Sequence, residues 1–246
     1  MYSSIINSLR DFPLKSIQIG INWTAVVVEK DGLQQCGLAS TVSGSHDHGS
    51  EPTIPDPGHL EKNSALELTS WINSGIPLRR SIGCAAINAL LPLDSSKWVD
   101  QNAETAIQTH GRGKKVVLIG HFPFVEKLKN ELGELTVLDL NPSGEDLPAS
   151  AAPEVLPEAD LVAITGMTFI NHTLPELLDL CKPEAFILML GPSTPLSPIL
   201  YDFGVNLLAG AVVENIPAVL TAISQGANFR QVHKAGVRLV TQVAAA

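Results

Sequence analysis

The chain has 246 residues and a formal charge of −9 at pH 7, from 16 basic and 25 acidic residues. This balance opposes nonspecific binding to DNA, RNA or anionic membranes, which requires clustered Lys and Arg. The three cysteines are far apart, so they predict neither a disulfide framework nor a metal knuckle, and no apolar run is long enough to span a bilayer. We therefore expect a soluble, cytoplasmic protein that binds neither nucleic acid nor membrane.

Residues 1–100 predict a small α+β domain. The opening MYSSIINSLRDF has the pattern of an amphipathic helix, and SIQIGINWTAVVVEKDGLQQCGLAST predicts antiparallel strands. The turn between two of these strands falls at Lys30-Asp31-Gly32, because Asp and Gly tolerate positive φ. An irregular loop rich in Gly, Pro, Ser, Asp and His follows. Helical periodicity then returns in LEKNSALELTSWIN and RRSIGCAAINALL.

Residues 101–246 predict a second domain in which apolar strands alternate with helices. Strands are expected near residues 116–120, 136–140, 161–165, 185–190 and 206–212, and helices near 124–132, 174–181, 195–202 and 216–225. Such alternation predicts an α/β fold with a Rossmann-like parallel sheet and helices on both faces. Its ligand crevice lies at the carboxyl ends of the strands. The Pro- and Ala-rich residues 141–160 are expected to cross the surface or to lie over this crevice.

The segment VVLIGHFPFVEKLKNELGELTVLDLN predicts the first strand-helix-strand unit of this domain. If its first strand ends at Gly120, the following helix N-terminus favours an anion. Asp139 lies 19 residues beyond Gly120 (139 − 120), where such folds place a carboxylate that accepts from a ribose hydroxyl. Phe122 and Val125 occupy the places of two glycines in the dinucleotide fingerprint. The segment therefore favours a single phosphate or carboxylate over an ordinary dinucleotide.

Polar residues gather after the other predicted strands of the second domain. They are Thr165, Gly166 and Thr168 after one strand, with Asn171 further on, Gly191 and Pro192 after the next, and Glu214 after the last. These residues indicate an anion or sugar site, or else ordinary helix capping. His121 and Glu214 are candidates for a general acid and base, and a purely structural histidine is the alternative.

His46-Asp47-His48, with His59 downstream, offers a candidate metal site. Imidazole and carboxylate ligands suit zinc, copper or nickel. The alternative is a solvated loop with no metal, because Gly and Pro surround these residues.

Several segments together resemble the heavy-metal chelation family, a domain family of unknown function. They are GINWTAV, SIGCAAINALL, VVLIGHFPFVEKL, ITGMTFINHTLPELLDLC, LMLGPSTPLSPILYDFGVNLLAGAVVEN and QGANFRQVHKAGVRL. The resemblance implies an N-terminal domain similar to the enolase N-terminal domain, a Rossmann-like C-terminal domain and an active site in the cleft between them. By motif matching, the cleft is lined by Asn22, Trp23, Thr24 and Asn88 from the first domain, and by Gly120, His121, Phe122, Asp139, Thr165, Gly166, Thr168, Asn171, Gly191, Pro192 and Glu214 from the second.

Three functions are consistent with these observations. The first is binding or modification of an anionic small molecule in the interdomain cleft, in the service of heavy-metal chelation. The second is a non-catalytic metal-binding protein that uses His46 and His48. The third is a nucleotide- or S-adenosylmethionine-dependent transferase, which rests on fold analogy alone. The cofactor is unknown, the expected partner is a small anionic ligand or a metal complex, and a two-fold homodimer is the default assembly.

Overall fold

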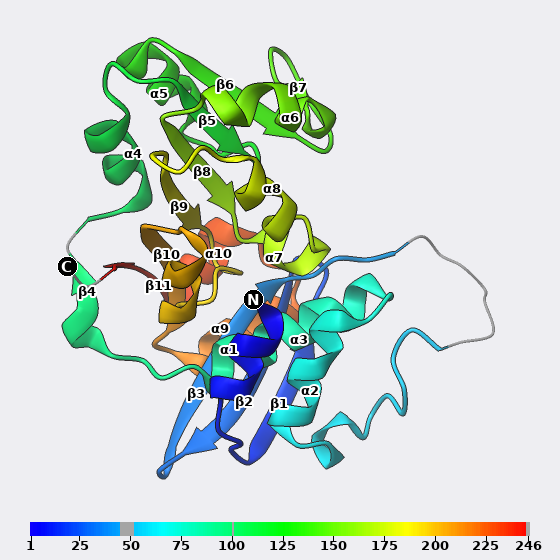
Figure 1. The fold of residues 1–246 in the computed structure, drawn as a ribbon. Coiled ribbons are helices and arrows are strands. Elements are labelled where there is room, and N and C mark those ends of the chain that lie inside the picture. The colour runs from blue at the N-terminus through cyan, green and yellow to red at the C-terminus, as the bar shows by residue number, and fades with distance from the viewer. Residues whose placement is uncertain (45–51, 100, 245–246) are drawn as a thin grey trace.

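The computed structural model describes residues 1–44, 52–99 and 101–244, which form two sheets with helices packed around them (Figure 1). The smaller sheet has the order β1-β2-β3 and is antiparallel. Its strands are β1 (Leu14–Ile19), β2 (Trp23–Lys30) and β3 (Leu33–Ser40). The turn between β2 and β3 places Asp31 and Gly32 at positive φ, as the sequence predicts.

Helices of the first hundred residues cover one face of the smaller sheet. They are α1 (Tyr2–Ser8), α2 (Ala65–Thr69) and α3 (Pro77–Leu90), with short 3-10 turns η1 (Leu60–Lys62), η2 (Ser70–Asn73) and η3 (Ser95–Lys97). Pro77 occupies the first position of α3, where the missing N–H costs no hydrogen bond. Ser64 and Glu67 form a capping box at the start of α2.

The larger sheet has eight strands in the order β4-β11-β10-β9-β8-β5-β6-β7. The strands are β4 (Trp98–Val99), β5 (Val116–Ile119), β6 (Leu135–Asp139), β7 (Leu147–Pro148), β8 (Leu161–Thr165), β9 (Phe186–Leu190), β10 (Leu207–Val213) and β11 (Val237–Val243). β5 to β10 pair in parallel, so the α/β class with a Rossmann-like sheet is confirmed. The sheet is not wholly parallel, because β11 runs antiparallel to both β10 and β4.

Helices lie on both faces of the larger sheet. They are α4 (Ala103–Gly111), α5 (Val125–Leu132), α6 (Ala152–Val155), α7 (Met167–Asn171), α8 (Leu174–Leu180), α9 (Ile216–Ser224) and α10 (Phe229–Ala235), with 3-10 turns η4 (Ala149–Ala151), η5 (Leu156–Glu158) and η6 (Pro198–Phe203). Apolar residues of α4 and α5 pack with one face of the central strands. Apolar residues of α6, α7 and α8 pack with the other face. No helix among the described residues is long and apolar enough to cross a membrane.

The smaller sheet lies between α3 and the C-terminal helices α9 and α10. Val26 and Val28 of β2 join the buried cluster that contains α3 and extends to Ile164 and Met189 of the larger sheet. Ala25 and Val27, on the other face of the same strand, pack with α9, α10 and β11. This alternation follows from the period of two in a strand, and both faces of β2 are therefore buried.

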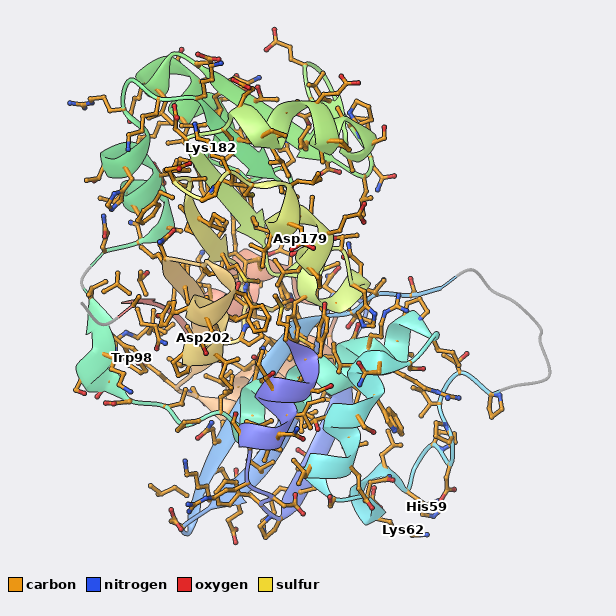
Figure 2. All side chains as sticks on the ribbon, in the orientation of Figure 1. His59, Lys62, Trp98, Asp179, Lys182 and Asp202 are labelled. Carbon is orange, nitrogen blue, oxygen red and sulfur yellow. The ribbon has the colours of Figure 1, made fainter. Side chains whose placement is uncertain are left out.

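Most of the predicted elements are present, and the structure adds others. Residues 195–202 predict an α-helix, but the structure has only the 3-10 turn η6 from Pro198, because Ser197, the residue before this proline, is extended and cannot continue a helix from Pro195. The sequence did not predict the helices α4, α6, α7 and α10 or the strands β7 and β11. β4 pairs with β11 through Trp98, which Figure 2 labels at the side of the molecule away from α8, so residues near position 98 belong to the larger sheet.

Close packing of β3 on α3 depends on Gly37. A Cβ atom at this position lies 2.1 Å from the carbonyl oxygen of Ala85 and 2.2 Å from the backbone nitrogen of Ala89. We expect Gly37→Ala to lower the free energy of unfolding by roughly 1–3 kcal/mol, because backbone atoms must shift to admit the methyl group. Urea denaturation measures this change.

Gly75→Ala is the matched control, because a Cβ atom there meets nothing within 4 Å. Its free energy of unfolding should stay within about 0.5 kcal/mol of the parent value. Equal effects at the two positions would contradict the assigned packing of α3 on β3.

Candidate functional site

A pocket of about 510 Å³ opens at the carboxyl ends of β5, β6 and β8. This is the point in the strand order where the chain changes direction, since β6 lies on one side of β5 and β8 on the other. In open α/β sheets, ligands bind at such a switch point. The lining residues are Ile119, Gly120, His121, Leu138, Asp139, Leu140, Asn141, Ala149, Ser150, Ala152, Pro153, Thr165, Met167, Thr168, Asn171, Thr173, Glu176, Leu177 and Leu180.

The turn after β5 is shaped by Gly120 and held by Asp139. Gly120 has φ +101°, a conformation that favours glycine, and its Cα faces Thr165 of β8 so closely that an added Cβ comes within 3.1 Å. One carboxylate oxygen of Asp139 accepts a hydrogen bond from the backbone N–H of His121 at 3.0 Å. The other accepts from the backbone N–H of Asn141 at 2.8 Å. A single carboxylate therefore joins the ends of β5 and β6.

The His121 side chain has its own carboxylate partner. Its Nδ1 lies 2.8 Å from a carboxylate oxygen of Asp146, which lies just before β7. The same oxygen receives longer contacts of 3.4 Å from the backbone N–H and the hydroxyl of Ser143. Burial acts to raise the pKa of Asp146, but the hydrogen bonds from His121 and Ser143 outweigh it and hold that pKa below its ordinary value. The carboxyl group is therefore ionised near neutral pH.

Residues of α7 and α8, and of the turn between these helices, also line the pocket. Thr168 donates a hydrogen bond to the carbonyl of Thr165 at 2.7 Å, and the Asn171 side-chain oxygen accepts from the hydroxyl of Thr173 at 2.7 Å. Glu176 is exposed in the first turn of α8 and makes no ion pair or hydrogen bond within the described part of the chain. Figure 2 labels Asp179 on α8, the helix that also supplies Leu177 and Leu180 to the pocket.

Six of the residues expected at the site line this pocket. They are Gly120, His121, Asp139, Thr165, Thr168 and Asn171. The segment of residues 141–160 lies beside the pocket, because Asn141, Ala149, Ser150, Ala152 and Pro153 contribute to its lining. Most of residues 141–150 are also exposed, so both predicted courses describe this segment.

Five residues expected from the second domain lie outside the pocket lining: Phe122, Gly166, Gly191, Pro192 and Glu214. Phe122 stacks on Phe124, with ring centroids 5.3 Å apart, and packs toward α4 and α5. A Cβ atom on Gly166 lies 2.6 Å from the backbone nitrogen of Thr194, so this glycine permits close packing of two loops. Gly191 and Pro192 begin the loop after β9, whose next residue, Ser193, contacts the smaller sheet.

Glu214 and His121 are not neighbours. Glu214 follows β10, which is separated from β5 by β9 and β8. Three strand spacings correspond to roughly 14 Å. Glu214 instead lies 3.4 Å from Arg238 on the adjacent strand, so the structure does not bring the two predicted catalytic residues together.

The residues expected from the first domain also lie outside the pocket lining. The Asn22 amide donates to the carbonyls of Gly226 and Ala227, both at 3.1 Å, and Trp23 packs on Phe229. The hydroxyls of Thr24 and Thr41 are 2.9 Å apart, and Asn88 donates to the carbonyl of Leu38 at 2.9 Å. These contacts join strands and helices to one another.

Of the predicted metal ligands, His46 and His48, like Asp47 between them, lie outside the described residues. His59 is described, and its Nδ1 lies 3.0 Å from Asp56 at the lower edge of the molecule in Figure 2. Within residues 1–44, 52–99 and 101–244, no group of three or more His, Cys, Asp or Glu side chains is arranged to hold a metal ion.

Asp146 and Glu176 are residues that the sequence did not single out as site residues. Asp146 is separated from its partner His121 by 25 residues and lies in a loop rich in Pro and Gly, where no periodicity places a side chain. Glu176 follows Pro175 at the start of α8, a pattern that also suits an ordinary first helical turn.

This fold defines an α/β protein with a Rossmann-like larger sheet, and comparison with known proteins identifies its family. Two family models, both described as "Putative heavy-metal chelation", match residues 2–91 and 103–241. The chain therefore belongs to this heavy-metal chelation family. It is 26% identical, over 85% of its length and 82% of the relative's, to an uncharacterised protein of Methanocaldococcus jannaschii.

Two solved structures resemble the chain over nearly its whole length. Both are described as proteins of unknown function from the same family. The one from Desulfitobacterium hafniense has a TM-score of 0.79 and 26% identity, and covers 98% of this chain and 97% of its own. The one from Pyrococcus horikoshii has a TM-score of 0.82 and 25% identity, and covers 98% of each chain.

The paired hydrogen bonds of Asp139 give a testable consequence. We expect Asp139→Asn to lower the free energy of unfolding by about 1–3 kcal/mol, because the amide NH₂ group cannot accept and leaves one of two backbone donors unpaired. Hydrogen exchange should quicken at the amides of His121 and Asn141, which both bond to Asp139. Mass spectrometry of exchanged peptides measures the local effect.

Glu176→Gln is the control within the same pocket. Since Glu176 makes no hydrogen bond in the described part of the chain, its replacement should leave stability within about 0.5 kcal/mol of the parent. Exchange at His121 that is unchanged by Asp139→Asn would show that the carboxylate does not hold the turn.

Proposed function

We propose that this protein binds or modifies a small organic molecule in the pocket at β5, β6 and β8, as its part in heavy-metal chelation. The observation that carries the proposal is the meeting of Gly120, Asp139 and Thr165 around one pocket at the switch point of the sheet. The pocket is formed by residues of the larger sheet and its helices. We therefore place the ligand there rather than against Asn22, Trp23, Thr24 and Asn88.

The charges of the pocket favour a ligand with two kinds of polar group. The imidazole of His121 lines the pocket and, in its charged form, pairs with an anionic group. Asp139 and Glu176 favour hydroxyl or amino donors. Apart from His121, no basic side chain lines the pocket in the described part of the chain, which opposes a polyanion such as a nucleoside triphosphate. An anionic molecule that also carries hydroxyl or amino groups fits best.

The apolar part of the pocket lining favours a ligand that has a hydrocarbon part as well as polar groups. Leu140, Met167, Leu177 and Leu180 contribute to the same pocket, and Leu140 remains 69% exposed. A bound carbon skeleton would bury this surface, at about 25 cal/mol for each Å² removed from water. The proposed ligand therefore combines a hydrocarbon part with the mixed polar groups.

Native mass spectrometry of gently purified protein tests the proposal. We expect an organic mass to be retained, and we expect Glu176→Gln and Asp139→Asn each to weaken its retention roughly tenfold or more. One charge-assisted hydrogen bond contributes about 1.5–3 kcal/mol, which corresponds to such a factor. Glu176→Gln is the more direct test, because we expect it to leave stability unchanged.

Glu214→Gln is the matched control for the position of the site. Glu214 follows a strand of the same sheet but pairs with Arg238 away from the pocket. Retention should be unchanged in this variant. Loss of the ligand in Glu214→Gln, with full retention in the two pocket variants, would contradict the proposal and favour a site nearer β10. Adding S-adenosylmethionine and nucleotides in the same measurement tests the transferase alternative.

A second candidate is direct metal binding by the segment that contains His46 and His48. The observation that favours it is the His-Asp-His sequence itself, whose residues are good ligands for zinc or copper. This alternative predicts one Zn²⁺ per chain in elemental analysis, and loss of that metal in the double variant His46→Ala, His48→Ala.

His59→Ala is the control for the metal measurement, because His59 is paired with Asp56. This variant should keep its zinc if the other two histidines hold it. Stoichiometric zinc that survives the double change rules out His46 and His48 as the ligands.

A further inference from the structure

The His121 residue is held at two points by two different carboxylates. Its backbone N–H donates to Asp139, and its ring Nδ1 lies 2.8 Å from Asp146. Since the backbone and the ring are fixed independently, the imidazole has little freedom to turn. His121 also lines the pocket, so a ligand there meets a ring of defined orientation.

The chemistry of Asp146 determines which ring nitrogen carries the proton. An ionised carboxylate can only accept hydrogen bonds, so Nδ1 of His121 must donate. In the neutral ring, Nε2 then has a free lone pair. No hydrogen bond to Nε2 is present in the described part of the chain, so this nitrogen is left for a ligand or for water.

The His121–Asp146 pair differs from a second His–Asp pair of the molecule, His59–Asp56, in the exposure of its carboxylate. His59 and Asp56 are three residues apart in one loop, and their side chains are 52% and 69% exposed. In the pocket, the Asp146 side chain is only 2% exposed, while that of His121 is 44% exposed. A carboxylate removed from water has few other partners and orients a histidine far more firmly than one that water solvates.

We propose that Asp146 is a positioning residue, and that it holds His121 with Nε2 as a proton acceptor for a ligand in the pocket. In the step, an O–H or N–H bond of the ligand breaks and its electron pair stays on the ligand atom. The proton bonds to Nε2, and the imidazolium that forms is stabilised by the Asp146 carboxylate. The presence of a ligand rests on the proposed function, whereas the orientation of the ring does not.

Nitrogen NMR of the full-length protein with ¹⁵N-labelled histidine tests the orientation without any ligand. We expect the neutral His121 ring to carry its proton on Nδ1, by a factor of about ten, which one charge-assisted hydrogen bond supplies. His59, whose partner Asp56 is exposed to water, serves as the internal reference and should show a weaker preference for the proton on Nδ1. A His121 ring that is protonated mainly on Nε2 would overturn the proposal, whether or not the pocket binds a molecule.

Asp146→Asn provides the second test, because asparagine has the same shape but can either donate or accept. We expect the Nδ1–H preference to disappear, and acylation of His121 by diethyl pyrocarbonate to slow several-fold, as measured on peptides by mass spectrometry. Glu145→Gln is the matched control, since the exposed Glu145 pairs with Lys129 and makes no contact with His121. Equal behaviour of Asp146→Asn and the parent chain in both measurements would overturn the assignment.

Discussion

The candidate site depends on one carboxylate that bonds to two backbone amides. Asp139 ends β6, yet it accepts hydrogen bonds from His121 beyond β5 and from Asn141 beyond its own strand. Parallel strands bring their carboxyl ends to the same edge, but they do not fix the turns that follow. Asp139 fixes these turns through their backbone amides. A second carboxylate, Asp146, orients the His121 ring. The mouth of the pocket is thus built from hydrogen bonds between residues far apart in the chain.

Asp139 is less free to bind a ligand than the corresponding carboxylate of a dinucleotide-binding domain. In such domains the acidic residue after the second strand accepts from a ribose hydroxyl. Both oxygens of Asp139 already accept from backbone donors, although each oxygen has a second lone pair for a further donor. Asp139 is therefore first a structural residue and only then a residue for recognition. The sequence spacing places Asp139 at the end of the second strand, but it does not indicate that the carboxylate holds two backbone amides.

The two sheets act as one body through contacts that the family motifs supply. The backbone N–H of Ser40, at the end of β3, donates to the hydroxyl of Ser193 at 2.9 Å. The hydroxyl of Tyr2, on α1, donates to the carbonyl of Phe169 on α7 at 3.0 Å. Asn22 reaches the turn between α9 and α10. Segments such as GINWTAV therefore have a clear structural role in joining the two parts, which explains their specific sequence without reference to a ligand.

How much of this could be predicted from the sequence depends on the range of the interactions involved. The strands near residues 116–119 and 161–165 and the helix after Pro123 follow from local patterns, and each lies where it was expected. Gly120, Asp139 and Thr165 could be placed together because parallel strands share an edge. The strand order was not predictable, so Glu214 could not be separated from His121. Asp146 could not be found either, since a loop without periodicity gives no indication of the direction of its side chains.

The chemistry of chelation bears on whether the metal ligands belong to the protein or to the small molecule that it binds. A tightly held metal ion needs several ligands at once, commonly four for zinc. Among the described residues, no three such side chains are arranged to hold a metal ion, and this includes the histidine and two carboxylates that line the pocket beside its apolar wall. Such a lining can orient an organic molecule and accept its protons. It does not provide the arranged ligands that would let the protein coordinate a metal ion in place of that molecule. On our proposal, the atoms that coordinate the metal belong to the ligand of the pocket, and His121 with Asp146 acts on that ligand by taking its proton, which is the change that turns a hydroxyl or ammonium group into a metal donor.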